Sequence, residues 1–403
     1  MFWESKKDNE IQDVVLSAVS KNVNFRDNVL LGVPGTHLDE KVFPLNDTVG
    51  DNPFLTAFVA NPNHIGMHTN GESEIFFAGT HGLENDVIRI CAEEIMRAEK
   101  DSYDGYISSG GTEANIQGVW QLRNFYIEQF GASVDDIAIL HSNDTHYSVY
   151  KAANLLNINE YSIPVENESR AVFPKDLRLT IEKAVDDGIK YFIVFLNMGT
   201  TMFGSVDDIE LFVKELKAFD IKFNIHIDGA FGGFIYPFTN LNNKLCFKNP
   251  FVSSITMDAH KMLQAPYGTG IFLSKREFSE FTHTKKASYV KGQDSTLCGS
   301  RSGANAISVW MILSSYGSEG GKEFCRELLE RTNILCDGLK SRGVNFYRNK
   351  FMNIVTIPST ELTVELARKY HLVLDTETNP KWFKIVVMDH VKLDAINLFL
   401  AEL

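Results

Sequence analysis

Short apolar runs alternate with helical segments between residues 103 and 273 of this 403-residue chain. The run Tyr191–Leu196 is apolar throughout, which is typical of a strand buried on both faces of a parallel sheet. Helical segments are expected on either side of it, at 176–188 and 209–219. Alternating units of this length predict a doubly wound α/β sheet, with its ligand at the C-terminal ends of the strands.

A glycine pair marks the start of one predicted helix. The expected strand Tyr103–Ile107 leads into Ser109-Gly-Gly-Thr112, and a helix is expected over Glu113–Phe130. Free amides in the first turn of a helix favour an anion, as does the helix dipole, and glycine lets the backbone approach it. The stretch therefore outlines a phosphate site, although a glycine pair before a helix is often only a tight turn. It is not the Gly-x-Gly-x-x-Gly pattern of nicotinamide-binding sites.

A lysine follows another apolar run. Residues Val252–Met257 are expected to form a strand that delivers Asp258, His260 and Lys261 to a loop. Burial there would disfavour the ammonium form, so Lys261 is a candidate Schiff-base nucleophile. The alternative is a lysine that reaches the surface at a strand end. Upstream, a short strand ends at Asp228, and the order phosphate site, acid, lysine is what a pyridoxal 5′-phosphate (PLP) site requires.

Six stretches of the chain resemble the group II PLP-dependent decarboxylases of fold type I. In chain order they are SSGGTEAN, THYS, NMGTTMFGSVDD, HIDGAFGGF, MDAHKM and GSRSG. The chain is similar to the histidine and serine decarboxylases of this family, but its Ala114 and its lysine stretch look more like the archaeal tyrosine/aspartate decarboxylases and the sphingosine-phosphate lyases. From about residue 60 onward, the resemblance implies an aspartate aminotransferase-like fold, with a mostly parallel central sheet and a small C-terminal α+β domain.

The resemblance implies roles for individual residues. Lys261 would bind PLP as a Schiff base, Asp228 would pair with the pyridine nitrogen, and His146 would stack on the ring. A carboxylate at that nitrogen keeps it protonated, so the ring can accept the electron pair left when a bond at the substrate α-carbon breaks. Taken alone, Asp228 could equally cap a loop, and His146 could lie near a helix start without chemistry. The further cofactor contacts implied are Gly111, Thr112, Thr200, Thr201, Ala230, Asp258 and His260.

Two residues are candidates for substrate contact. His64 lies in Ala60–Thr69, a stretch with turn signals, where a histidine is either a substrate contact or a structural residue. Arg301 lies in Ser-Arg-Ser-Gly and could bind phosphate or a substrate carboxylate with its planar guanidinium, across a dimer interface. The alternative for Arg301 is a plain surface arginine.

The activity that the resemblance implies is decarboxylation of an L-amino acid to the corresponding primary amine and CO₂. Three alternatives stay open. A carbon–carbon lyase would split a bond further along the substrate, as the sphingosine-phosphate lyases do. A carbon–sulfur lyase would use a loop cysteine, and Cys298 is the only one suitably placed. The chain could also be a PLP-binding subunit without catalysis.

The composition argues against several other kinds of partner. A formal net charge of −13 without a basic block disfavours nucleic acids and anionic membranes and leaves a small molecule as the expected ligand. The resemblance implies that this small molecule is an amino acid. Five scattered cysteines predict neither a zinc site nor disulfides and fit a reducing compartment. No run approaches the roughly 18 apolar residues of a membrane span, and the N-terminus is charged where a signal peptide would be apolar. The protein is therefore expected in the cytoplasm.

Three regions are expected along the chain. An N-terminal arm covers residues 1–55 and contains a helix at Glu10–Ser20; a large PLP-binding α/β domain covers 56–300. A helical connection and the small C-terminal α+β domain cover 301–403. The resemblance also implies a homodimer with its active site at the subunit interface, and no metal.

Overall fold

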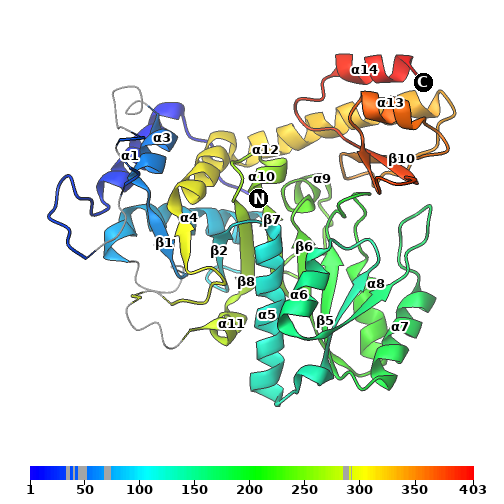
Figure 1. Ribbon diagram of the computed structural model, residues 1–403, viewed down its shortest axis with the longest axis horizontal. Coiled ribbons are helices and arrows are strands. Elements are labelled where there is room, and N and C mark those ends of the chain that lie inside the picture. The colour runs from blue at the N-terminus through cyan, green and yellow to red at the C-terminus, as the bar shows by residue number, and fades with distance from the viewer. Residues whose placement is uncertain (33–36, 40, 44–51, 68–73, 285–289, 292) are drawn as a thin grey trace. The chain divides into compact units, whose positions relative to one another are not determined.

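The computed structural model describes residues 1–32, 37–39, 41–43, 52–67, 74–284, 290–291 and 293–403 (Figure 1). Packing of the backbone divides the chain into two units. The first consists of Met1–Val134 and Cys246–Gly321, and the second of Asp135–Leu245 and Lys322–Leu403. The predicted domain boundaries after residues 55 and 300 stay a prediction, and part of the predicted N-terminal arm lies outside the described residues.

The central sheet contains seven strands, which are β2 (Tyr103–Ser108), β3 (Ile137–Ser142), β4 (Asn159–Ile163), β5 (Tyr191–Asn197), β6 (Lys222–Gly229), β7 (Val252–Asp258) and β8 (Gly270–Lys275). In the first unit their order is β2-β8-β7, and in the second unit it is β6-β5-β3-β4. In the first unit, β8 runs antiparallel to β2 and to β7. In the second unit, β4 and β5 both pair with β3 in parallel, and β6 pairs with β5 in parallel. The predicted mostly parallel α/β sheet is confirmed, with β8 as its antiparallel member.

Burial explains why these runs form central strands. Every residue of β2, β3 and β7 is buried, and β5 is buried from Phe192 onward. A strand covered on both faces can be apolar at successive positions, as Ile137–Leu140 is. Strand β4, at the end of the order, is mostly half-buried.

The helices of this region are α4 (Ala78–Arg89), α5 (Gly111–Phe130), α6 (Ser148–Leu156), α7 (Pro174–Asp186), α8 (Ile209–Ala218), α9 (Tyr236–Thr239), α10 (Ala259–Met262) and α11 (Arg276–Ser279). Helix α8 begins after Asp208, whose side chain accepts from the first-turn amides of Glu210 and Leu211. A π-helical turn at Ile90–Ile95 continues α4. Short 3₁₀ turns lie at Ile75–Phe77, Val134–Asp136, Gly232–Phe234 and Glu280–Thr282.

One local prediction around the lysine is wrong. The sequence predicted a loop after β7, but Lys261 lies in α10, a single helical turn that starts directly after Asp258. The turn is too short for its hydrophobic periodicity to be recognised in a sequence.

The N-terminal part contains α1 (Asp8–Ser20), which confirms the predicted helix, and α3 (Pro53–Ala60). Two three-residue strands that the sequence did not predict, β1 (Asn63–Ile65) and β9 (Ser300–Ser302), pair antiparallel and place His64 opposite Arg301. This pairing joins the stretch with turn signals to the Ser-Arg-Ser-Gly stretch, more than 200 residues later in the chain.

Helix α12 (Gly303–Lys340) is interrupted at Gly317. Gly317 has φ +61°, and a Cβ atom there would lie 2.6 Å from the backbone nitrogen of Ser5. The N-terminal segment fills this break: the amide of Ser318 donates to the carbonyl of Trp3, and Trp3 itself is 7% exposed. Glycine is therefore required at the break both for the backbone conformation and for space.

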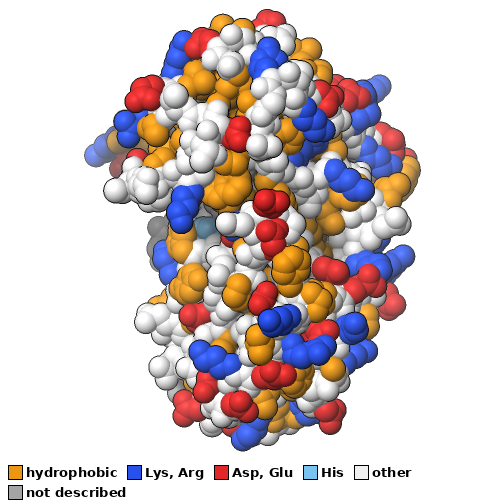
Figure 2. Space-filling view, turned by 90° about the vertical axis from the view of Figure 1, so that its right-hand side faces the viewer, with side chains coloured by type: hydrophobic (Ala, Val, Ile, Leu, Met, Phe, Trp, Pro, Cys, Tyr) orange, Lys and Arg blue, Asp and Glu red, His pale blue; other side chains and the backbone are white. Residues whose placement is uncertain are grey.

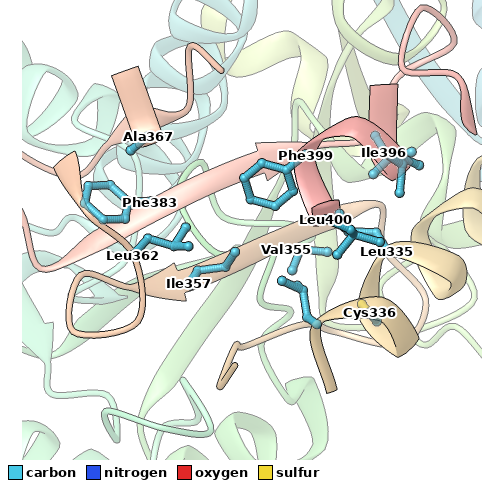
Figure 3. Close-up of a cluster of buried hydrophobic side chains, with 12 residues drawn as sticks. Leu335, Cys336, Val355, Ile357, Leu362, Ala367, Phe383, Ile396, Phe399 and Leu400 are labelled. Carbon is cyan, nitrogen blue, oxygen red and sulfur yellow. The ribbon is translucent and has the colours of Figure 1, made fainter. Parts of the chain in front are cut away.

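The last part of the chain has a hydrophobic core of its own (Figure 3). Strand β12 (Trp382–Val386) lies between β10 (Ile354–Pro358) and β11 (Val373–Leu374), and both pairs are antiparallel. Helices α13 (Val364–Lys369) and α14 (Leu393–Ala401) and the end of α12 pack against this sheet through buried residues. These residues include Leu335, Leu339, Val355, Ile357, Ala367, Phe383, Phe399 and Leu400. The predicted small C-terminal α+β domain is confirmed.

On the face drawn in Figure 2, basic and acidic side chains are interspersed, in line with the absence of a basic block from the sequence. Among the described residues, no helix combines the length and hydropathy needed to cross a membrane.

Candidate active site

The predicted phosphate turn lies between β2 and α5. Gly110 is the residue before α5 and has φ 153°, a conformation that favours glycine, and its helix start has no side-chain cap. The amides of Gly111 and Thr112 are in the first helical turn and have no intrahelical acceptor. Glu113 accepts a hydrogen bond from the backbone nitrogen of Ser109 at 2.8 Å, and this bond stabilises the conformation of the turn. The turn can therefore present free backbone donors to an anion.

The first residue of β8 approaches this turn closely. A Cβ atom at Gly270 would lie 2.4 Å from Ser108 Oγ and 2.5 Å from the carbonyl carbon of Gly110. No side chain fits there, so glycine at position 270 is required by packing against the turn. No role was predicted for Gly270, because the residue that it approaches, Gly110, lies 160 residues earlier in the chain.

Lys261 lies beside a buried carboxylate. Its Nζ is 3.2 Å from Asp258 Oδ2, and the lysine side chain is 36% exposed while that of Asp258 is 2% exposed. The spacing of three residues across the start of α10 brings the two groups together. The amine is therefore accessible, and its ammonium form has a nearby counter-charge.

His260 connects the lysine to the phosphate turn. A Cβ atom built on Gly110 would lie 3.7 Å from His260 Cε1. Burial lowers the pKa of His260, and the charge of Lys261 acts in the same direction, so the ring is neutral at pH 7. Its Nδ1 is buried without a hydrogen-bond partner among the described residues. The first unit thus brings the predicted phosphate contacts Gly111, Thr112 and His260 together with Lys261.

In the second unit, His146 is held in one tautomer. Its Nδ1 accepts a hydrogen bond from the backbone nitrogen of Ser148 at 3.2 Å and lies 3.0 Å from Ser148 Oγ. An acceptor nitrogen carries no proton, so in the neutral ring the proton is on Nε2. The ring also packs against Tyr147, with 4.0 Å between centroids. The half-buried imidazole can therefore donate a hydrogen bond through Nε2.

Asp228 lies near the end of β6, as predicted, and is 7% exposed. Its Oδ1 accepts a hydrogen bond from the backbone nitrogen of Ala230 at 3.0 Å. Ala230 is buried, and only a small side chain stands at that position. Two residues before Asp228, burial lowers the pKa of His226 to about 4.

The two candidate threonines differ in what their side chains do. Thr200 is 3% exposed, and its Oγ1 lies 2.7 Å from Ser205 Oγ inside the turn that follows β5. Thr201 is exposed, while its carbonyl oxygen accepts a hydrogen bond from Lys384 Nζ at 3.0 Å. Of the two, Thr201 has the side chain that can reach a ligand, and Thr200 stabilises the turn.

His64 and Arg301 lie together in a buried ion-pair network and not at a surface. His64 is 0% exposed, with Nδ1 2.8 Å from Glu84 Oε2 and Nε2 3.0 Å from Thr80 Oγ1. Arg301 pairs with the same glutamate and donates to the carbonyl oxygen of Ile107 at 3.1 Å. Burial opposes ionisation of Glu84, but Arg301 and His64 outweigh it and hold the pKa of that carboxyl well below its usual range. This geometry argues against both predicted substrate contacts, and the plain surface arginine is wrong as well.

Sequence reasoning missed two residues of the second unit. Asn197 is the first and Asp207 the next-to-last residue of the NMGTTMFGSVDD stretch, and hydrogen bonds at 2.7 and 2.8 Å join them. Burial raises the pKa of Asp207 to about 6. Their position inside a recognised motif was the available signal, but a contact between its two ends cannot be read from the letters alone.

The chain matches a family of known proteins over most of its length. The model of the pyridoxal-dependent decarboxylase conserved domain matches residues 80–354. A tryptophan decarboxylase of Clostridium sporogenes is 44% identical over 405 residues, covering 100% of this chain and 97% of the relative. A probable L-tyrosine/L-aspartate decarboxylase of Methanocella arvoryzae is 31% identical, covering 87% of this chain and 92% of the relative.

Solved structures agree on the fold. The L-methionine decarboxylase of Streptomyces sp. 590 superposes with a TM-score of 0.70 at 21% identity, covering 98% of this chain and 93% of that chain. With a family model that covers more than half of the residues and a relative similar from end to end, the chain belongs to the pyridoxal-dependent decarboxylases, as an enzyme that uses PLP to decarboxylate an amino acid.

Proposed function

We propose that this decarboxylase acts on an aromatic L-amino acid of the tryptophan type and releases the corresponding aromatic amine and CO₂. One observation carries the proposal: the 44% identity with a tryptophan decarboxylase extends over the whole chain. The tyrosine/aspartate and histidine decarboxylases among the relatives are 28–31% identical and cover 72–87% of it. Residues that select the side chain are therefore expected to follow the tryptophan enzyme.

A panel of L-amino acids tests this proposal. The purified, PLP-loaded protein is incubated with each member, and mass spectrometry detects a product lighter by one CO₂. Tryptophan is expected to give tryptamine faster than tyrosine or phenylalanine gives its amine. An amine from aspartate, serine or histidine alone would contradict the proposed substrate class while leaving decarboxylation in place.

We further propose the residues that hold PLP. The free amides at Gly111 and Thr112 and the buried, unpartnered Nδ1 of His260 support a phosphate site, because each can bind a phosphate oxygen. Lys261, two-thirds buried beside Asp258, is the proposed Schiff-base residue, and Asp228 is the proposed partner of the pyridine nitrogen. When bound, PLP supplies the electron sink for the pair left at the α-carbon as CO₂ departs.

His146 is proposed to act on the substrate side. Because Ser148 occupies Nδ1, the proton of the neutral ring is held at Nε2, where it can donate to a carboxylate or to a carbon that is being protonated. Ala230 has no side chain beyond Cβ, which supports its proposed place beneath the ring. Thr201, with its exposed side chain, is the proposed ligand of the ring or of neighbouring atoms.

The alternatives from the sequence find less support. Burial raises the pKa of the Cys298 thiol, and the neighbouring Glu113 adds to this, so the thiolate needed for carbon–sulfur cleavage is scarce at neutral pH. Cys298→Ser should therefore leave turnover unchanged, and a loss of activity would support the carbon–sulfur lyase hypothesis instead. A sphingosine-1-phosphate lyase of Burkholderia pseudomallei superposes on this chain with a TM-score of 0.67 at 18% identity, a similarity that supports the fold alone.

A homodimer with the active site at its interface is proposed as the assembly. Large exposed side chains near the N-terminus support it: Val29 is 90% exposed, Leu31 96% and Val42 66%. Five free thiols, four of them buried, support the proposed location in the reducing cytoplasm. Light scattering coupled to size-exclusion chromatography would test the dimer, and a monomer at micromolar concentration with full activity would refute it.

A further inference from the structure

The turn between β5 and α8 is closed at its base by one carboxylate. Asp207 Oδ2 accepts hydrogen bonds from the backbone nitrogen of Asn197 at 2.7 Å and from its Nδ2 at 2.8 Å. The backbone nitrogen of Asp207 donates to the carbonyl oxygen of Asn197 at 3.0 Å. Asn197 is 2% exposed, so water does not replace these bonds. Asp207 therefore binds Asn197, the last residue of β5, through both the backbone and the side chain of Asp207.

The same amide of Asn197 reaches the segment that leads to His146. Its Nδ2 lies 3.2 Å from Ser142 Oγ, at the end of β3, and 2.9 Å from Thr145 Oγ1. Ser142 is 1% exposed and Thr145 is 7% exposed. Thr145 directly precedes His146, so the amide of Asn197 fixes the backbone from which that imidazole projects.

The turn is also attached to the two other predicted ring contacts. The backbone nitrogen of Met198 donates to the carbonyl oxygen of Asp228 at 2.8 Å, and Asn197 lies opposite Asp228 in the β5–β6 register. Thr201 lies four residues beyond Asn197 in the same turn, whose fold depends on its closed base. The segments that carry His146, Thr201 and Asp228 thus all connect to the pair formed by Asn197 and Asp207.

We propose that Asp207 is a positioning residue for the decarboxylation, because it orients Asn197 and thereby the segments that carry His146, Thr201 and Asp228. This inference rests on the function proposed above for these residues. A carboxylate only accepts hydrogen bonds, so it turns the Nδ2 end of the amide, and not Oδ1, toward itself and the two hydroxyls. Without the carboxylate the amide can rotate, and a misplacement of reacting groups by about 1 Å costs on the order of 10²-fold in rate.

Charged and titratable groups surround the Asp207 carboxyl. Burial raises the pKa of Asp207 to about 6, and the charge of Asp144 acts in the same direction, while His141 acts against it. Asp144 is itself paired with Arg170, at 2.9 Å between Oδ2 and Nε. Tyr347 is near as well: burial raises the pKa of its phenol, and the charges of Asp144 and Asp207 act in the same direction. The carboxylate is therefore present at pH 7.5 and is lost as the pH falls below about 6.

The test compares Asp207→Ala and Asp207→Asn with Asp208→Asn in the PLP-loaded enzyme. Asp208 is the next residue, is exposed, and caps α8, a role that asparagine also fills. Four quantities are measured: kcat, KM, the circular dichroism band of bound PLP, and the melting temperature of the PLP-free protein. Asp207→Ala is expected to lower kcat about 10²-fold with KM within about threefold, and to change the PLP band. Asp208→Asn should keep all four quantities near the wild-type values.

Asp207→Asn adds a readout that a purely structural residue would not change. It keeps an acceptor for Asn197 but does not titrate, so its PLP band should be the same at pH 7.5 and pH 5.5, whereas the wild-type band should change. Unchanged kcat and an unchanged PLP band in Asp207→Ala would overturn the inference, as would a kcat loss fully explained by a lower folded fraction. Where Asp207→Ala does not fold, a wild-type kcat and a wild-type pH response in Asp207→Asn would overturn it.

The proposed function is tested separately with Lys261→Ala and Asp228→Asn. Normal turnover in either variant would refute the proposed roles of these residues. The PLP band of the Asp207 variants would still show whether that carboxylate orders the cofactor site, so the two failures are distinguishable.

Discussion

His226 links the pH of the solution to the stability of the central sheet. It lies in β6, is 0% exposed, and packs against Phe195 with 5.0 Å between ring centroids. Burial lowers its pKa to about 4 from an ordinary value of 6.5. The unfolded chain therefore binds a proton more readily than the folded one between these two pH values. The contribution of neutral His226 to the stability of the fold is fully present above about pH 6.5 and is lost as the pH falls toward 4.

The size of the effect follows from the two pKa values. At 1.36 kcal/mol per pKa unit, the lowered pKa of His226 reduces the free energy of unfolding by about 3 kcal/mol when the pH falls through the whole range between the two pKa values. Between pH 7.5 and pH 5.0 the loss amounts to about 2 kcal/mol, because the lower part of the window is not reached. Asp207 titrates in the opposite sense, since its raised pKa makes the fold less stable as the pH rises from about 4 to 6.

The assay compares the wild-type protein with His226→Gln. Free energies of unfolding are obtained from urea titrations of the PLP-free protein, followed by far-ultraviolet circular dichroism at both pH values. His226→Gln is expected to be less stable at pH 7.5 but to lose about 2 kcal/mol less than the wild type on going to pH 5.0. Contributions from Asp207 and from the carboxylates cancel in this difference. An equal loss in both proteins would refute the argument, because it would show that His226 does not titrate differently in the folded state.

Three further predictions concern the lysine, the phosphate turn and the buried ion pair. Lys261→Ala should abolish turnover and the absorption band of the PLP Schiff base, and a visible spectrum like that of the wild type would contradict its role. Gly270→Ala introduces a Cβ atom 2.4 Å from a side-chain oxygen of the phosphate turn, so overpacking of about 1–3 kcal/mol should weaken PLP binding roughly tenfold or more. Gly82→Ala, whose Cβ meets no atom within 4 Å, is the matched control for a fluorescence titration with PLP. Glu84→Gln leaves the guanidinium of Arg301 buried without its counter-charge and should destabilise the PLP-free protein by about 3–5 kcal/mol in urea, and an unchanged midpoint would show that the pair is dispensable.

Much of the central sheet was predictable because its signals are local. A strand such as Tyr191–Leu196 is recognised from the apolar character of its own residues, and the helix at Gly111–Phe130 from its glycine start. The order of the motifs along the chain was enough to identify the family and the cofactor.

The positions of Lys261, Asp228 and His146 at the ends of strands follow from this local pattern as well. Their roles toward PLP stay a prediction, although each position agrees with the proposed chemistry. His260 is a partial case: its place next to Lys261 is local, but its approach to Gly110 is a contact between segments 150 residues apart.

The sequence by itself determined the alternation of strands and helices, the glycine turn and the order of histidine, acid and lysine, since each depends on residues close together in the chain. Only the tertiary structure decided that β8 is antiparallel, that His64 and Arg301 share the carboxylate of Glu84, and that Asp207 closes the turn at Asn197. A charged or polar side chain looks the same in a sequence whether it meets solvent, a ligand or a buried partner. The packing of the core decides which distant segments meet, and so which partner such a side chain has. The partner determines whether the residue binds a substrate or supports the fold.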